Sequence, residues 1–388
     1  MTLDRMMALA VTEHDDVLMD LATPATRPAD PRAVKLPVGT IVVSADDHWT
    51  CAKDIFWEGF PDHLKDKAPR WHQDSENWGY WTLDGKPVLP LGRAAPLQDF
   101  ESVPGCSKME PRMRDLDAEG VDKEIVFPNT IQAFLGFPDL EVREWIFRIY
   151  NQYSARLQAG APDRFYPVAL ANFWDMEKTR ESILEIKELG LKAVFLPQFP
   201  KGADGLEFDY CSPETDPLWA ALEEAGLPVC FHVGEFAKGG PGGMAIGAMV
   251  GFQPFRKVLA ELIFSGILDR HPTLQVIFTE ADINWVPGAL QCATMLYEAF
   301  RPFLDPQIEH HPRHYWQRNC YATFMHDPVG MRMLDIVGAD RVMWSCDYVH
   351  IESNFGYSSL SKQLILDTVS EDDARAILGG TAMRVFDL

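Results

Sequence analysis

The sequence predicts an α/β fold of the (β/α)8, or TIM-barrel, class, with an N-terminal arm and a β-hairpin insertion after the first strand. Three observations predict it. The length of 388 residues suits one such barrel with extensions. Short β-prone runs alternate with helix-like stretches, which is the pattern of βα units. Eight such runs are found, and their apolar character is nearly continuous, as in parallel strands that are buried on both faces.

Each expected strand ends in polar residues and is followed by a stretch with apolar residues three and four positions apart. The expected strands are 40–45, 123–127, 166–170, 193–197, 228–232, 275–280, 320–324 and 341–346. The expected helices are 111–119, 142–157, 178–189, 216–225, 254–268 and 328–337. Asp216-Pro217 and Asp327-Pro328 are helix start signals, and a glycine follows several of the expected helix ends.

Two segments depart from this rhythm. Residues 1–38 end in a stretch rich in Pro and Ala, which indicates an irregular extension before a barrel domain at 39–388. Residues 49–108 form an insertion in which aromatic and polar residues alternate around Asp84-Gly85. This pattern predicts a β-hairpin that roofs the active site. The segment 238–251 contains six glycines, which predicts a mobile or closely packed loop at the barrel mouth.

The composition excludes several function classes. The net charge of −22 repels nucleic acid and anionic membrane surfaces. No stretch reaches the roughly 18 apolar residues of a membrane span, and the N-terminus lacks the basic region of a signal peptide. The seven cysteines form no CxxC pair, which favours a reduced, cytoplasmic setting. We therefore expect a small-molecule substrate as the partner.

Polar residues that suit metal binding gather at the expected strand ends. Asp46 and His48 are two apart after the first strand, so both point to one side of it. His232, Glu280 and Asp347 end the fifth, sixth and eighth strands. Two imidazoles with two or three carboxylates at the catalytic rim of a barrel suit Zn²⁺, Mn²⁺ or Fe²⁺. The sequence thus predicts a divalent metal centre of one or two ions, which can activate a water molecule.

Each of these residues also has a structural explanation when it is taken alone. An Asp-x-His pair is common by chance, His232 fits a hydrogen-bonded core histidine, and Asp347 fits a helix or turn cap. What favours the metal centre is that all of them fall at strand ends of the first, fifth, sixth and eighth units. The clustered His310, His311 and His314 fall in an expected loop and are interpreted as surface residues.

Further residues are candidates for catalysis or substrate binding. Asp347, Glu280 and His326 are candidate acid/base groups, although His326 also fits the start of a helix. Trp49, His350 and Trp285 are candidate substrate-binding residues, with His350 also a candidate ligand of a second metal ion. For the two tryptophans, core packing is the alternative.

A family resemblance rests on several segments of this sequence. They are SADDH at 44–48, DLDAEGVDKEIVFP at 115–128, PDRFYPVALA at 162–171, LGLKAVFLP at 189–197, LWAALEEAGLPVCFHVG at 218–234, HPTLQVIFTEADINWVP at 271–287 and RVMWSCDYVH at 341–350. Together they resemble the amidohydrolase-related superfamily, in the amidohydrolase 2 branch of metal-dependent TIM barrels that includes aminocarboxymuconate-semialdehyde decarboxylase. The resemblance implies that Asp46, His48 and His232 bind metal, that Asp347 is a ligand or base, and that the chain forms a homodimer or higher homo-oligomer.

The sequence departs from this pattern at three positions. Glu280 stands where decarboxylases of the branch carry an acid/base histidine, and Cys51 stands where many relatives carry a glutamate. Gln198 offers no carboxylated lysine after the fourth strand. With Glu280 included, the candidate ligands comprise two histidines and three carboxylates. This acidic set resembles a group of TIM-barrel nonheme diiron monooxygenases in this branch.

Three hypotheses about function follow. The first is hydrolysis by a metal-activated water, or metal-assisted C–C lysis such as decarboxylation, of a small organic and aromatic substrate. The second is a diiron monooxygenase that hydroxylates a hydrophobic or CoA-linked substrate. The third is a non-catalytic binding barrel, which would follow if Cys51 and Glu280 mark decay of the site.

Overall fold

The computed structural model describes residues 33–388 apart from 76–77, 84, 89–102, 130, 203, 235–240, 252 and 351–352. Most of the expected N-terminal arm lies outside the described residues. Within the described part, no helix combines the length and the apolar character needed to cross a membrane.

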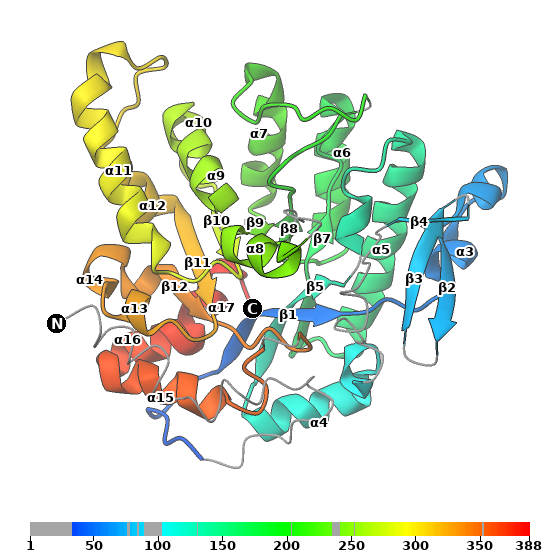
Figure 1. Ribbon diagram of the computed structural model, residues 1–388, viewed down its shortest axis with the longest axis horizontal. Coiled ribbons are helices and arrows are strands. Elements are labelled where there is room, and N and C mark those ends of the chain that lie inside the picture. The colour runs from blue at the N-terminus through cyan, green and yellow to red at the C-terminus, as the bar shows by residue number, and fades with distance from the viewer. Residues whose placement is uncertain are drawn as a thin grey trace.

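The core consists of parallel strands in the order of a TIM barrel, surrounded by helices (Figure 1). One sheet has the order β1-β5-β6, and the other has the order β12-β11-β10-β9-β8-β7. Their bounds are β1 Val43–Trp49, β5 Lys123–Pro128, β6 Phe165–Pro167, β7 Ala169–Leu170, β8 Val194–Phe195, β9 Val229–His232, β10 Val276–Thr279, β11 Cys320–Phe324 and β12 Val342–Trp344. All pairs within these two sheets are parallel.

Hydrogen bonds connect the two sheets on both sides. Only Val168 separates β6 from β7, and its N–H donates to Val126 O at 2.9 Å, while Ala169 N–H donates to Ala193 O at 2.9 Å. On the other side, the Asp347 N–H donates to Asp46 O at 2.8 Å. The expected TIM-barrel class is therefore confirmed, with β1 beside the segment that follows β12.

The first strand differs from its expected bounds of 40–45. It begins at Val43 and continues to Trp49, so Asp46 and His48 lie within the strand and not beyond it. The polar sequence Asp46-Asp47-His48 obscured this continuation. The residues are nevertheless fully buried, because the strand pairs with β5 on one side and contacts the segment after β12 on the other.

The helices that surround the strands agree with most of the expected ranges. They include α4 Met109–Glu119, α5 Leu140–Gly160, α6 Met176–Glu188, α7 Asp216–Ala225, α9 Gln253–Phe264, α10 Ile267–Arg270, α11 Trp285–Phe300, α12 Pro312–Asn319, α13 Pro328–Met331, α14 Leu334–Val337, α15 Ser358–Thr368, α16 Glu371–Arg375 and α17 Thr381–Val385. The expected helix 254–268 is divided at Gly266, whose φ of 73° is left-handed. The expected helix 328–337 is likewise divided into α13 and α14.

The glycine-rich segment is a correction. Residues 243–250 form the helix α8, Gly243–Val250, where a loop was expected. The sequence of this helix, GMAIGAMV, is apolar, and its alanine, isoleucine, methionine and valine residues outweigh the low helix propensity of its two glycines. Residues 235–240 lie outside the described part.

The expected hairpin at Asp84-Gly85 is confirmed, because β3 Trp78–Leu83 pairs antiparallel with β4 Lys86–Pro87. The strand β2 Arg70–Ser75 pairs with the other edge of β3. Trp81 packs edge-on against Phe56 at 4.9 Å. Figure 1 shows this sheet at the side of the molecule, near α3 Ile55–Gly59 and α5. The described part of the insertion is therefore attached to the flank, and 89–102 lie outside the described residues.

A buried ion pair supports β1 from the side of α4. Arg112 and Glu124 are both fully buried, and Arg112 Nη2 is 2.6 Å from Glu124 Oε2. Arg112 Nη1 also donates to the carbonyl oxygen of His48 at 2.8 Å and to that of Gly105 at 3.1 Å. The Arg112 guanidinium thus connects α4 with β5, β1 and the turn at Gly105, and it neutralises the charge of the buried Glu124.

We expect Arg112→Met to lower the free energy of unfolding by about 3–5 kcal/mol, because it leaves the Glu124 carboxylate buried without its partner. Urea denaturation followed by circular dichroism measures the change. Arg114→Ala is the control, since Arg114 pairs with Glu110 on the exposed surface of the same helix and its loss should cost less than about 0.5 kcal/mol. Equal effects of the two substitutions would contradict a supporting role for the pair.

Candidate metal centre

The polar side chains expected at the strand ends lie close together inside the barrel. Asp46 and His48 come from β1, and His232 is the last residue of β9. Glu280 directly follows β10, and Asp347 lies three residues beyond β12. Their donor atoms form two overlapping groups, in each of which all atoms lie within 4.8 Å of one another. The groups are Asp46, His48, His232 and Glu280, which we call the first donor group, and His48, Glu280, Asp347 and His350, which we call the second donor group.

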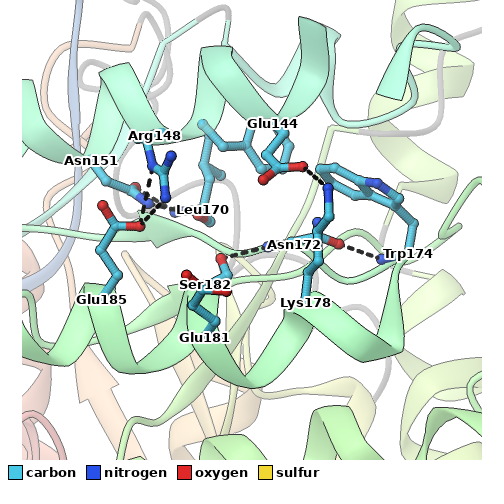
Figure 2. A pocket seen from close by; sticks show the side chains of 11 residues that line it. Glu144, Arg148, Asn151, Leu170, Asn172, Trp174, Lys178, Glu181, Ser182 and Glu185 are labelled. Carbon is cyan, nitrogen blue, oxygen red and sulfur yellow. Dashed lines mark hydrogen bonds and ion pairs between the residues drawn. The ribbon is translucent and has the colours of Figure 1, made fainter. Parts of the chain in front are cut away.

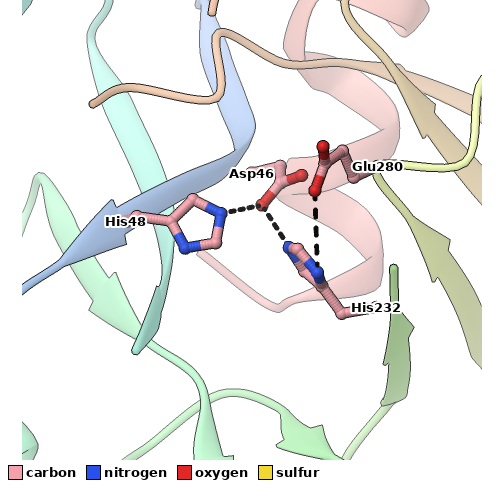
Figure 3. Close-up of side chains that lie close together, drawn as sticks. All are labelled: Asp46, His48, His232 and Glu280. Atoms are coloured by element: carbon pink, nitrogen blue, oxygen red, sulfur yellow. Dashed lines mark hydrogen bonds and ion pairs between the residues drawn. The ribbon is translucent and has the colours of Figure 1, made fainter. Parts of the chain in front are cut away.

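Asp46 lies between the two imidazoles of the first donor group (Figure 3). Its Oδ1 is 3.2 Å from His232 Nε2 and 3.6 Å from His48 Nε2. Side chains alternate along β1, so Asp46 and His48 share the inner face while Asp47 points to the other face. There, Asp47 Oδ1 accepts a hydrogen bond from Tyr348 N–H at 2.8 Å.

The tautomer of His232 is set by its own backbone neighbour. Its Nδ1 lies 2.8 Å from the carbonyl oxygen of Val233, which can only accept, so Nδ1 carries the hydrogen. The Nε2 lone pair therefore faces Asp46, which is the usual arrangement of a metal-binding histidine. Burial by itself lowers the pKa of His232, but the charge and hydrogen bond of Asp46 outweigh burial, so the pKa is raised overall. The site thus favours a cation at this nitrogen.

His48 is held in its neutral form. Burial lowers the pKa of His48 well below the usual value, and the nearby His350 and His232 lower it further. His48 Nε2 lies 3.1 Å from Asp347 Oδ1, but among the described residues neither ring nitrogen of His48 makes a hydrogen bond of acceptable geometry, and neither does Asp46 Oδ2. Buried polar atoms without partners are costly, at about 1–3 kcal/mol each. A divalent cation bound by these atoms would remove that cost, so the residues fit a metal ion.

His350 connects Asp347 with a residue that the sequence analysis missed. His350 Nδ1 is 2.9 Å from Asp347 Oδ1, and the His350 ring stacks on His48 at 3.8 Å. Its Nε2 is 3.2 Å from Asn129 Oδ1. Asn129 is buried directly after β5, and its Nδ2 donates to Thr50 Oγ1 at 3.3 Å. A polar residue at the end of the second strand is the same signal that pointed to the other residues.

Two of these carboxylates occupy a left-handed backbone conformation. The φ angles of Glu280 and Asp347 are 51° and 58°, which costs a residue other than glycine about 1–3 kcal/mol. Hydrogen bonds hold both residues in place, from Glu280 N–H to Thr323 Oγ1 and from Asp347 N–H to Asp46 O, each at 2.8 Å. Strain of this kind is typical of functional sites.

The other candidate residues lie outside the two donor groups. Trp49 packs edge-on against Phe165 at 5.2 Å, and its Nε1 donates to Tyr153 Oη at 3.1 Å. Trp49 lies on the face of β1 opposite Asp46 and His48. Its expected role in substrate binding is therefore wrong, because the side chain packs between the strand and α5 instead. Trp285 packs against Phe278, Phe255 and Trp316. Its role in substrate binding, and the catalytic role of His326, stay predictions.

Cys51 and Gln198, two of the positions at which the sequence departs from the family pattern, are both buried. Burial raises the pKa of the Cys51 thiol far above its usual value. Cys51 is therefore a thiol at neutral pH and not a thiolate ligand. Gln198 is fully buried, and its Nε2 donates to the carbonyl oxygen of His232 at 2.9 Å. Gln198 thus supports the backbone of a candidate ligand.

A separate cavity of about 230 Å³ lies between α5 and α6. Figure 2 shows that charged side chains line it, with Lys178 paired to Glu144 at 2.9 Å and Arg148 paired to Glu185 at 3.1 Å. It includes neither donor group. Because these charged side chains pair with each other across the cavity, we place the chemistry at the donor groups.

Comparisons with known proteins show the family and the fold of this chain. A family model described as amidohydrolase matches residues 68–388. No curated protein matches the sequence. Many solved structures share the fold, and three of them follow. An amidohydrolase from Mycobacterium avium subsp. paratuberculosis has a TM-score of 0.72 at 16% identity, covering 91% of this chain and 99% of that one. 2,6-Dihydroxybenzoate decarboxylase from Rhizobium has a TM-score of 0.64 at 20% identity, covering 90% and 99%. 5-Carboxyvanillate decarboxylase from Novosphingobium aromaticivorans, with bound manganese, has a TM-score of 0.68 at 18% identity, covering 92% and 100%.

We expect His232→Ala to abolish tight metal binding, because it removes an imidazole whose lone pair faces Asp46. The loss of affinity should exceed the about 10- to 100-fold that follows when only a hydrogen-bond partner of a ligand is removed. Elemental analysis and calorimetric titration with Mn²⁺ measure it. His63→Ala is the control, since the side chain of His63 is 66% exposed. Full retention of metal in His232→Ala would overturn the assignment.

Proposed function

Because the chain belongs to the amidohydrolase family, we propose that it is a metal-dependent lyase that removes CO2 from a small aromatic carboxylic acid. The observation that carries the proposal is the buried cluster of imidazoles and carboxylates at the strand ends, where a hydrogen-bonded His350–Asp347 pair adjoins the ligands. Two neighbours of the same fold are decarboxylases of aromatic acids, over at least 90% of this chain.

The first donor group would hold the resident metal ion. Its two imidazoles and two carboxylates suit a divalent transition ion, and we propose manganese, which the 5-carboxyvanillate decarboxylase binds. A bound divalent ion supplies Lewis acidity towards the oxygen atoms of a substrate. The rings of Phe127 and Phe195 lie 4.7 and 6.0 Å from the His232 ring. Both are buried, so this side of the centre excludes water, which strengthens electrostatic interactions there.

Decarboxylation requires a proton from the protein. The bond between the ring carbon and the carboxylate breaks, its electron pair stays on the carbon, and a proton must replace the CO2 that leaves. The His350–Asp347 pair is the proposed source. Asn129 Oδ1 accepts a hydrogen bond from Nε2 of His350, so the 3.1 Å hydrogen bond between Nδ1 and Asp347 Oδ2 needs a second proton between these two atoms.

This assignment accounts for Glu280. In the decarboxylases that the sequence resembles, the sixth strand ends in an acid/base histidine. Here Glu280 belongs to the donor groups, with Oε2 3.8 Å from His232 Nδ1. His350, which follows the eighth strand, supplies an imidazole at the same centre. We propose that the acid/base role has moved from the sixth strand to the eighth.

The other two functional hypotheses are less well supported. The two decarboxylases lend no support to the monooxygenase hypothesis or to hydrolysis, and no observation at the site favours either of them over decarboxylation. The intact cluster argues against a decayed, non-catalytic barrel. The cytoplasmic location, the small-molecule partner and the homo-oligomer stay predictions, the last of which light scattering of the purified protein can test.

We expect the Mn²⁺-loaded protein to release CO2 from at least one hydroxylated benzoate, tested with 2,6-dihydroxybenzoate, 5-carboxyvanillate and their isomers. In D2O the product should carry one deuterium at the carbon that lost CO2. Asp347→Asn and His350→Gln should lower kcat by about 10²- to 10⁴-fold, since they remove the proton source, and both should keep the first metal ion.

CO2 release is measured by coupled assay, and the label by mass spectrometry. His63→Ala should behave as the unmodified protein. The proposal fails if the panel shows no turnover above the metal-free background, or if His350→Gln turns over at the unmodified rate.

A further inference from the structure

We propose that the cavity between α5 and α6 is a binding site for an uncharged molecule of one aromatic ring that carries a carbonyl oxygen, such as an aromatic carboxamide. The cavity lies in the helical layer, at the end of β7, and it includes no residue of either donor group. Binding there depends neither on the metal centre nor on the proposed reaction. The volume of about 230 Å³ is smaller than the sites of roughly 300–1,000 Å³ that hold drug-sized ligands, which restricts the occupant to a small molecule.

The amide of Asn172 has one fixed orientation in the wall of this cavity. Its Oδ1 accepts hydrogen bonds from the backbone N–H groups of Trp174 at 3.3 Å and Asp175 at 3.0 Å, where α6 begins. Both partners can only donate, so the oxygen and the nitrogen of the amide cannot exchange places. The backbone of Asn172 is also fixed to α6, because its N–H donates to Ser182 Oγ at 3.0 Å and its carbonyl oxygen accepts from Thr179 Oγ1 at 2.8 Å.

The Nδ2 group of Asn172 is left without an acceptor. Asn172 is only 3% exposed, and its Nδ2 makes no hydrogen bond within the described part of the chain. A buried donor without a partner is unfavourable, and a carbonyl oxygen of a molecule in the cavity would be its acceptor. Asn151, in the same wall, has no such need. Its Nδ2 donates to Leu170 O at 2.8 Å, and its Oδ1 accepts from Leu170 N–H at 2.9 Å.

Ser182 adds a second donor beside Asn172. Its Oγ accepts the N–H of Asn172, and the hydroxyl has one hydrogen of its own to donate. Figure 2 shows these two residues between the two ion pairs of the lining. A carbonyl oxygen has two lone pairs, so one such oxygen can accept hydrogen bonds from both Asn172 and Ser182.

The charges of the lining favour an uncharged ligand. Lys178 and Arg148 are each paired with a glutamate, so neither cation is available to bind a carboxylate. Glu181 adds a third carboxylate to the lining, against these two cations. The net negative charge disfavours a bound carboxylate or phosphate. A cation is disfavoured beside Asn172, because the hydrogens of Nδ2 carry partial positive charge and repel it. An uncharged oxygen acceptor meets neither penalty.

Trp174 supplies an aromatic wall that is held in place by its neighbours. Its ring packs edge-on against Phe147 at 5.4 Å and against Phe173 at 5.1 Å, measured between ring centroids. The Arg143 guanidinium lies 4.5 Å from the centroid of the indole. Trp174 is nevertheless only partly buried, and it lines the cavity. Aromatic rings pack favourably on such a side chain, so a planar ring with a carbonyl group suits Trp174 and Asn172 together.

The experiment titrates three probes of similar size into the full-length protein: benzamide, benzoate and benzylammonium. The chain has 11 tryptophans, which are labelled as 5-fluorotryptophan and followed by fluorine NMR. The Trp174→Phe variant identifies the signal of Trp174, so binding at the metal centre is not counted. We expect benzamide to shift this signal with a Kd of about 1 mM or below. Benzoate and benzylammonium should bind about 10-fold more weakly or worse, because of their charge.

Two substitutions separate the donor from the charge. Asn172→Asp keeps an oxygen for the bonds to α6 and replaces the Nδ2 donor by a second oxygen, so benzamide should bind at least about 10-fold more weakly. Glu181→Gln removes one negative charge, so the difference between benzamide and benzoate should become smaller. Glu188→Gln is the matched control, since Glu188 is exposed on the same helix and does not line the cavity. It should leave all three affinities unchanged.

Three results would each overturn the proposal. One is the absence of a saturable shift at Trp174 with benzamide up to its solubility, which would mean that the cavity holds solvent only. Another is equal binding of the three probes, because the ring alone would then direct binding. The third is undiminished binding of benzamide by folded Asn172→Asp.

Discussion

Hydrogen bonds between β1 and the segment after β12 are the constraint on which the metal centre depends. Asp347 N–H donates to Asp46 O, Cys346 N–H donates to Ser44 Oγ, and Tyr348 N–H donates to Asp47 Oδ1, each at 2.8 Å. These bonds join positions about 300 residues apart in the chain. They place the ligands of the first strand beside the carboxylate and imidazole that follow the last strand. Left-handed backbone at Asp347 is the conformational cost of this connection.

The two faces of β1 carry charge for different reasons. The inner face presents Asp46 and His48 to the candidate metal centre. The outer face presents Asp47 to Arg112 and Glu124. Burial raises the pKa of Asp47 well above its usual value, and the neighbouring Glu124 raises it further against the opposing effect of Arg112. The guanidinium also binds the carbonyl oxygen of His48. Buried charge of this kind needs a cationic partner on each face. Arg112 is that partner on one side, and a bound metal ion would be the partner on the other.

Much of the fold and part of the site could be predicted from the sequence, because both depend on local patterns. Apolar runs that end in polar residues located the strands, and they placed His232 and Glu280 correctly. The pattern was misleading in β1, where polar residues are buried within the strand. It therefore placed Asp46 and His48 after the strand, although the strand continues to Trp49. Trp49 shows the same limit, since its outward direction depends on alternation within a strand whose true length was not apparent. Asn129 carries the same local signal, a polar residue directly after a strand, but its contact with His350 joins positions 221 residues apart and could not be read from the sequence.

The division of the candidate ligands into two donor groups could not be predicted from the sequence. Glu280 belongs to both groups, and its charge affects the whole centre. A carboxylate in place of an imidazole adds one negative charge to a buried site. Burial makes that charge unfavourable unless a cation or a proton accompanies it. At this centre the accompanying charge would come from a bound metal ion. The departure at Glu280 therefore raises the demand of this buried centre for a compensating positive charge.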